Sequence, residues 1–138
     1  MRVHHFCFFA AAIAALTGMS LGIGMGVMQD FTLAPVHAHI NLLGWVTLCL
    51  YGLYHRGVRR PSDRLAWIQT ALAAFSLPVM TGGLAAMFLS GDMRWEAAAI
   101  GGAFGTVAAM ALFVVILAGD LRRETGTPAL PAFTPRPI

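Results

Sequence analysis

The chain has 138 residues, of which 58% are hydrophobic and 11% are charged. The charged share is less than half of the roughly 25% found in soluble domains, which excludes an ordinary soluble protein. Intrinsic disorder is excluded as well, because it requires low hydrophobicity and high charge. The formal net charge is +3, and every basic residue is an arginine. The arginines gather where hydrophobic runs end, which favours a membrane-topology signal over nucleic-acid binding.

Four hydrophobic stretches predict transmembrane helices at about residues 6–28, 36–55, 65–89 and 96–119. Each has close to the ~20 residues that cross a ~30 Å hydrocarbon layer. We therefore expect an all-α fold, with one four-helix transmembrane bundle over residues 1–124 and a proline-rich tail over 125–138. The first stretch could instead be a signal peptide, but its apolar run continues without a clear small-x-small cleavage site after the core.

The arginines also predict the orientation of the bundle. Four of them lie between the second and third stretches and two follow the fourth, whereas the other two connections hold three acidic residues and one arginine: Arg56, Arg59, Arg60, Arg64, Arg122 and Arg123, against Asp30, Asp92, Glu96 and Arg94. Because arginine-rich short loops stay inside, both termini should be cytoplasmic. This predicts a multi-pass protein of a bacterial-type inner membrane, with the lipid bilayer as its partner and no nucleic acid.

Small residues recur at every fourth position in the first and fourth stretches. The two rows are Ala14, Gly18, Gly22 and Gly26, and Ala97, Gly101, Gly105 and Ala109. In lipid, small residues let helix backbones approach closely, so each row predicts a helix–helix contact. A row of this kind would equally leave room for the flat face of a porphyrin, and the sequence does not separate the two.

The second stretch carries a stripe of polar and small residues. At 3.6 residues per turn its members fall within about 40° of one line, which should face the bundle interior: His37, Asn41, Gly44, Leu48, Tyr51 and His55. His39 lies about 200° from His37, so the two imidazoles cannot chelate one ion while the segment is helical. The helix start at Pro35 favours neutral imidazole, the form that binds metals. We expect His55, His4 and His5 at the membrane interface.

The first ten residues from His37 onward resemble a segment of a known family. The segment His37-Ala38-His39-Ile40-Asn41-Leu42-Leu43-Gly44-Trp45-Val46 resembles the tenth transmembrane helix of haem-copper oxidase catalytic subunits, above all the C-type oxidases. The resemblance implies that His37 is the proximal ligand of a high-spin haem and that His39 ligates a low-spin haem. The oxidases have more helices and further haem-ligating and copper-ligating histidines, whereas no histidine follows His55 here. We therefore expect no complete oxidase from this chain alone.

The leading hypothesis is a small membrane protein that binds b-type haem noncovalently through His37, His39 or both. Its role would be electron transfer, haem handling or gas sensing, with Asn41 and Gly44 beside the haem. Met25, Met28 or His39 of a second subunit would supply the second axial ligand. The alternative is a cofactor-free subunit or assembly factor that docks on a larger respiratory membrane complex through its glycine rows. Solute transport is weaker, because four helices with one polar stripe offer a thin pathway unless the protein is a homo-oligomer.

Overall fold

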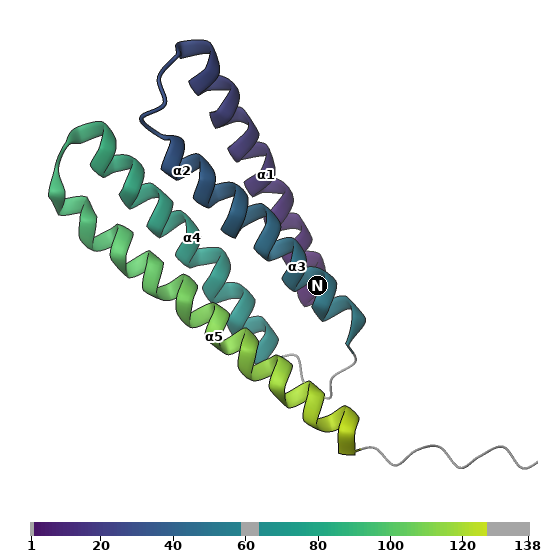
Figure 1. Ribbon diagram of the computed structural model, residues 1–138. Helices are drawn as coiled ribbons and strands as arrows, with labels where there is room; N and C mark the ends of the chain where they lie inside the picture. Colours follow the sequence, from purple (N-terminus) through teal and green to yellow (C-terminus); the bar gives the residue numbers. More distant parts are fainter. Residues whose placement is uncertain (1, 59–63, 127–138) are drawn as a thin grey trace, which may run out of the picture.

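The computed structural model describes residues 2–58 and 64–126, and within these ranges it contains helices, turns and no strand (Figure 1). The elements are α1 (Val3–Met28), α2 (Ala34–His39), the π-helical segment η1 (Ile40–Thr47), α3 (Leu48–Gly57), α4 (Arg64–Ser90), the short 3₁₀ helix η2 (Met93–Trp95) and α5 (Glu96–Gly126). The predicted all-α class is therefore confirmed. α5 includes residues 125 and 126 of the predicted tail, and residues 127–138 lie outside the described ranges.

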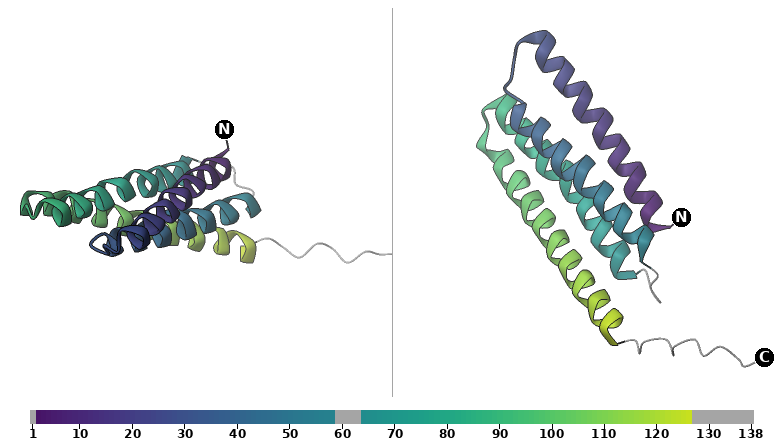
Figure 2. Two further views of the ribbon diagram at one scale, coloured as in Figure 1. Left: turned by 90° about the horizontal axis from the view of Figure 1, so that it is seen from above. Right: turned by 45° about the vertical axis from the view of Figure 1, so that its right-hand side comes forward.

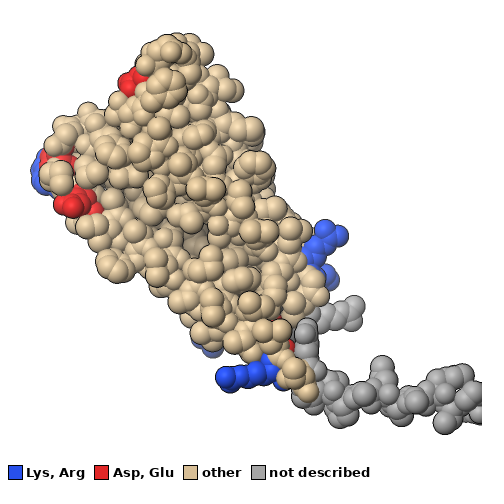
Figure 3. Space-filling view, viewed as in Figure 1, with Lys and Arg blue, Asp and Glu red and all other residues tan. Residues whose placement is uncertain are grey.

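Four helical spans are long and apolar enough to cross a membrane, as the hydrophobic stretches predict. They are Val3–Met28, Ala34–Gly57, Arg64–Ser90 and Met93–Arg123. The shortest has 24 residues, which at 1.5 Å per residue gives about 36 Å, more than the ~30 Å hydrocarbon core. Figure 3 shows charged side chains at the two ends of the visible face and a broad uncharged zone between them. Large apolar side chains such as Phe9, Leu53 and Phe104 are exposed on the helices, which suits contact with lipid.

The helices form two antiparallel hairpins that lie side by side (Figures 1 and 2). One hairpin joins α1 to the continuous α2–η1–α3 segment, and the other joins α4 to α5. We call the end with the 29–33 and 91–92 connections the turn end, and the end with residue 2 and the close of α5 the terminus end. Arg56, Arg64 and Arg123 lie at the terminus end and are exposed, whereas Arg59 and Arg60 lie outside the described residues. Asp30 and Asp92 lie in the connections of the turn end.

Glycines bring α4 and α5 into backbone contact. A Cβ at Gly102 would lie 2.6 Å from Cα of Met80, and a Cβ at Gly83 would lie 2.6 Å from the backbone N of Ala99. At Gly101, by contrast, a Cβ would meet nothing within 4 Å. The predicted row is therefore wrong at Ala97 and Gly101, which are both exposed. A strict spacing of four residues drifts around a helix of 3.6 residues per turn. The row at the contact alternates steps of four and three: Ala98, Gly102, Gly105 and Ala109.

The row of α1 packs on the polar stripe, as a helix–helix contact would. A Cβ at Gly18 would lie 2.6 Å from Nδ2 of Asn41, and one at Gly22 would lie 2.8 Å from Cε1 of His37. At Gly26 a Cβ would meet nothing within 4 Å. The space above Gly18 and Gly22 is thus filled by two side chains of the stripe and leaves no flat slot for a porphyrin there.

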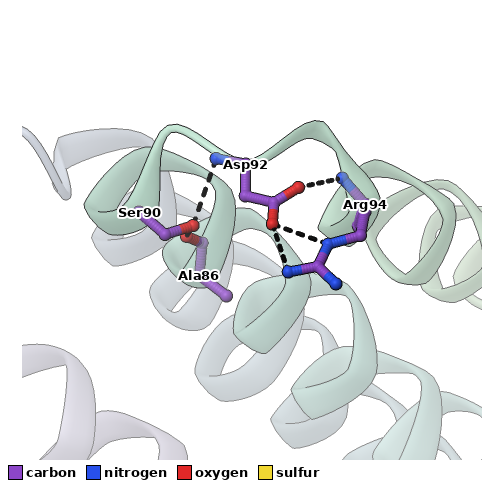
Figure 4. Close-up of polar contacts among 4 residues, drawn as sticks. All are labelled: Ala86, Ser90, Asp92 and Arg94. Carbon is purple, nitrogen blue, oxygen red and sulfur yellow. Dashed lines mark hydrogen bonds and ion pairs between the residues drawn. The ribbon is translucent and has the colours of Figure 1, made fainter.

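Hydrogen bonds around Asp92 fix the connection between α4 and α5 (Figure 4). The Asp92 carboxylate accepts from the backbone N of Arg94 at 2.9 Å and from its Nε at 2.7 Å. Ser90 Oγ donates to the carbonyl of Ala86 and accepts from the backbone N of Asp92. Gly91 has a φ of +67°, which glycine adopts without strain. The side chain of Arg94, with its backbone N–H, holds the pKa of Asp92 below its ordinary value.

Candidate functional site

Two histidines stand in the first turns of the second membrane span, at the turn end. α2 begins at Ala34 with Pro35 in its first turn, and His37 and His39 follow. Nδ1 of His37 lies 2.9 Å from the carbonyl oxygen of Gly18, and Nδ1 of His39 lies 2.7 Å from that of Pro35. A carbonyl oxygen only accepts, so in each ring Nδ1 carries the proton and donates. The neutral ring then has an unprotonated Nε2, which is the arrangement of most metal-ligating histidines.

His37 is held in the contact between α1 and α2. Its ring contacts the backbone at Gly22, and Nδ2 of Asn41 lies 3.4 Å from both ring nitrogens. The same Asn41 Nδ2 donates to the backbone carbonyl of His37 at 2.9 Å. His37 is therefore fixed on one side by α1 and on another by Asn41, and it serves as a polar packing residue between two helices.

His39 has different surroundings, as the 200° between the two residues predicts. The hydrogen bond of its ring stays within its own helix, and its side chain is half-buried. Nε2 of His39 has no hydrogen-bond partner among the described residues. Among all residues that the structure describes, no three His, Cys, Asp or Glu side chains lie together as a group that could hold a metal ion.

The segment that follows the histidines is a π-helix rather than the regular α-helix that the sequence predicts. η1 spans Ile40–Thr47, and Thr47 Oγ1 donates to the carbonyl of Leu42, five residues back, at 2.8 Å. π-helical turns are rare and are frequently found at functional sites. Gly44 in this segment stays buried, because a Cβ there would lie 2.7 Å from Cβ of Ala14 and 2.8 Å from Cδ2 of Leu77. Gly44 therefore faces the bundle interior, as its place in the polar stripe predicts.

A cleft lies between η1 and α3 on one side and α4 and α5 on the other. Its volume is about 200 Å³, and it is lined by Leu43, Thr47, Tyr51, Ala73, Thr106, Val107 and Met110. Three of these residues, Leu43, Thr47 and Tyr51, follow one another at a spacing of four along the second span. Toward the terminus end, Phe113 of α5 packs on the rings of Tyr51 and Tyr54, with centroids 4.7 and 5.0 Å away.

Sequence reasoning missed a buried polar cluster near the terminus end. The sequence places His55 both on the inward-facing stripe and at the membrane interface; its side chain is 7% exposed, and its Nε2 lies 3.1 Å from Oε1 of Gln69, which is 0% exposed. Tyr51 is also buried, and Tyr54 donates to Asp120 of α5 at 2.9 Å. The stripe faces the interior as far as His55, which is why this side chain is buried. Nothing near Gln69 or Asp120 in the sequence marks them as partners of the second span.

The two methionines of the hypothesis differ in burial. Met25 is 8% exposed and Met28 is 76% exposed, so α1 buries one and presents the other at the surface. No family model, curated protein or solved structure matches this chain. The resemblance of residues 37–46 to a haem-copper oxidase helix therefore stays a prediction from the sequence.

Proposed function

We propose that this chain is a small multi-pass membrane protein that binds b-type haem noncovalently, with His39 as the main axial ligand. What supports the proposal is the state of that imidazole. Its Nδ1 donates to the Pro35 carbonyl at 2.7 Å, which leaves Nε2 of the neutral ring unprotonated. A hydrogen bond of this kind orients a ligating histidine and raises its basicity. The His-x-His…Leu-Gly-Trp resemblance implies His39 as the ligand of a low-spin haem, beside His37 as the ligand of a high-spin haem.

His37 suits the role less well, because its ring is already packed between Gly22 and Asn41. Its Nδ1 bond to Gly18 would still orient it, so we assign it the positioning of α2 against α1. Asn41 and Gly44 also contact α1, and these contacts fix the position of His39 along the helix axis.

The shape of the bundle limits where a haem could lie. The cleft lined by Leu43, Thr47 and Tyr51 has about 200 Å³, below the roughly 300–1,000 Å³ of enclosed ligand sites. A haem on His39 would therefore rest on the side of the bundle, with lipid or a second copy of the chain over its other face. When bound, the iron would supply a reversible one-electron change or a site for a diatomic gas, which suits electron transfer or haem and gas handling.

Two sources of a second axial ligand fit the structure. Met25 is buried in the last turns of α1 at the turn end, where His39 also lies. His39 of a second copy is the other source, and it would make the protein a homo-oligomer. Met28 is the weaker candidate, because its side chain is exposed and nothing in the described structure orients it.

We infer further that the terminus end faces the cytoplasm of a bacterial-type inner membrane. Arg56, Arg64 and Arg123 lie at that end, and Asp30 and Asp92 lie at the other. This separation supports the positive-inside orientation. The proposed haem would then lie near the outer surface, as the resemblance implies.

Absorption spectroscopy of the purified protein tests the haem proposal. The protein is expressed with adequate haem supply, and wild type is compared with His39→Ala, His37→Ala and the double variant. We expect a Soret band in wild type, its loss in His39→Ala, and retention of haem with lower thermal stability in His37→Ala. His5→Ala, in which an exposed histidine is removed, is the matched control.

A colourless wild type that stays colourless on haemin titration would refute haem binding. It would favour the cofactor-free docking subunit, for which one observation speaks. Six helical glycines have nothing within 4 Å of a Cβ position in the described structure: Gly24, Gly26, Gly57, Gly82, Gly101 and Gly119. Such glycines leave backbone open for close approach by a helix of another protein.

A further inference from the structure

A groove lies between the first turns of α4 and the last third of α5, at the terminus end of the bundle. Its volume is about 490 Å³, within the roughly 300–1,000 Å³ typical of ligand sites. His39 lies at the turn end, so this groove is separate from the proposed haem site and does not depend on haem.

Much of the groove is apolar and opens sideways to the bilayer. Leu65, Ile68 and Val115 line it and are 41%, 50% and 59% exposed. Gly119 lines it as well, and a Cβ there would meet nothing within 4 Å among the described residues. The lining of α5 runs from Val115 to Arg123, which is about 12 Å along the helix axis at 1.5 Å per residue. A lipid chain could therefore enter the groove from the side and lie along it.

Two arginines line the same groove where the helices reach the membrane surface. Arg64 is the first residue of α4, and Arg123 is the last residue of the fourth membrane span. Both are exposed, and Figure 3 shows basic side chains at this end of the bundle. A guanidinium presents five N–H donors in a planar fork that matches a phosphate. Each arginine can therefore bind a phosphate beside its other contacts in the chain.

One carboxylate also lines the groove. Asp120 is 9% exposed, and its Oδ2 accepts a hydrogen bond from the hydroxyl of Tyr54 at 2.9 Å. Because Tyr54 belongs to α3, this bond directs the carboxylate toward α3 and the interior of the bundle. The lining thus has two positive charges at its exposed edge and one negative charge that is buried, which favours an anion at that edge.

We propose that this groove binds one anionic phospholipid. The phosphate accepts hydrogen bonds from Arg64 and Arg123, and an acyl chain lies along the apolar lining. A soluble phosphate would leave the apolar lining unused, and a neutral hydrocarbon would leave the arginines unused. Basic pockets between membrane helices on the cytoplasmic side bind anionic headgroups. With the orientation proposed above, the lipid belongs to the inner leaflet.

Native mass spectrometry of the full-length protein in a neutral detergent tests the proposal. The probe is dioleoylphosphatidylglycerol, and dioleoylphosphatidylcholine offers the same chains with a zwitterionic headgroup. We expect saturable binding of the first lipid to wild type and several-fold weaker binding of the second, whose ammonium group would lie near the two arginines. Arg64→Gln and Arg123→Gln should each weaken binding of the anionic lipid about fivefold. Arg122→Gln is the matched control, because it removes the same charge one residue away, from a position outside the lining.

Gly119→Leu tests the apolar part of the groove without changing its charge. The leucine side chain would occupy the open space beside α5, so it should weaken binding of the anionic lipid several-fold. Gly101→Leu places the same side chain on the same helix at another open position, outside the groove. This control should bind the lipid as wild type does.

The proposal is overturned if wild type binds both lipids equally well, which would leave the groove to bulk lipid chains. It is also overturned if Arg122→Gln weakens binding as much as Arg123→Gln does, which would indicate attraction to the whole basic surface. Displacement of the lipid by an equal concentration of glycerol 3-phosphate would assign the arginines to a soluble anion and would overturn it as well. Circular dichroism identifies any arginine variant that fails to fold, and Gly119→Leu then decides. A colourless protein that binds the anionic lipid would refute the haem proposal and leave this one standing.

Discussion

Replacing Gly102 with alanine tests the α4–α5 contact directly. A Cβ at this position would lie 2.6 Å from Cα of Met80 and equally close to its Cβ, whereas ordinary van der Waals contact begins at 3.4 Å. The obstructing atoms include backbone, so no side-chain rotation relieves the overlap and the two helices must separate. Helix association in lipid depends on close packing, so the contacts on either side of Gly102 weaken as well.

The size of the effect follows from two opposing terms. Overpacking costs about 1–3 kcal/mol, and an overlap with backbone belongs in the upper half of that range. Replacing a helical glycine with alanine returns about 0.8–1 kcal/mol of helix propensity. We therefore expect Gly102→Ala to lower the free energy of unfolding by about 1–2 kcal/mol.

Gly101→Ala is the matched control, because it makes the same change on the same helix one residue away. Its Cβ would meet nothing within 4 Å, so only the propensity gain remains and the variant should be more stable than wild type by up to about 1 kcal/mol. The assay is reversible unfolding in mixed detergent micelles, followed by circular dichroism. If Gly102→Ala proves as stable as Gly101→Ala, the face of α5 assigned to this contact is wrong.

Three further predictions concern other parts of the bundle. Gly44→Leu should destabilise the protein by about 1–3 kcal/mol through overpacking, since Ala14 and Leu77 already occupy the space. Gly52→Ala should cost less, because its Cβ would meet mainly the ring of Phe8, which can turn. Equal melting temperatures of the two variants would contradict this prediction. Asp92→Asn should destabilise the protein near pH 6 and not near pH 2. Because folding lowers the pKa of Asp92, its carboxylate stabilises the folded protein above the ordinary pKa of 3.8, and this stability is lost as the pH falls through the pKa of the folded state. A pH-independent difference in stability between the two proteins would argue against this prediction. In a background without the two native cysteines, Gly57→Cys should resist a membrane-impermeant thiol reagent added to intact cells, and Ser90→Cys should react; the reverse pattern would invert the topology.

The number and approximate bounds of the helices could be predicted because membrane spans depend on the length of a hydrophobic run. A run of about 20 apolar residues has few other stable structures in lipid. The predicted second span, 36–55, lies within the observed Ala34–Gly57, and the predicted fourth, 96–119, lies within Met93–Arg123. The inward face of the second span could be predicted as well, since its polar residues stand at helical spacing and Gly44, Leu48 and Tyr51 are buried.

The contacting face of α5 could not be predicted in the same way. Almost every residue from Ala97 to Ala111 is small or apolar, so the sequence offers several rows of similar character. The choice between Gly101 and Gly102 depends on the partner helix, where Met80 brings its backbone against the second. The π-helical segment has no sequence signal either, because its i→i+5 bonds replace α-helical ones at a cost that tertiary contacts must offset.

The burial of Gln69 depends on a pairing between two hairpins and is likewise invisible in a single helix. On its own, one glutamine near the start of a hydrophobic span is typical of an interfacial residue. Only the approach of α4 to α3 brings Gln69 to His55 and makes it an interior group. A polar side chain is costly inside a membrane span unless it is paired, and the bond to His55 offsets that cost for Gln69.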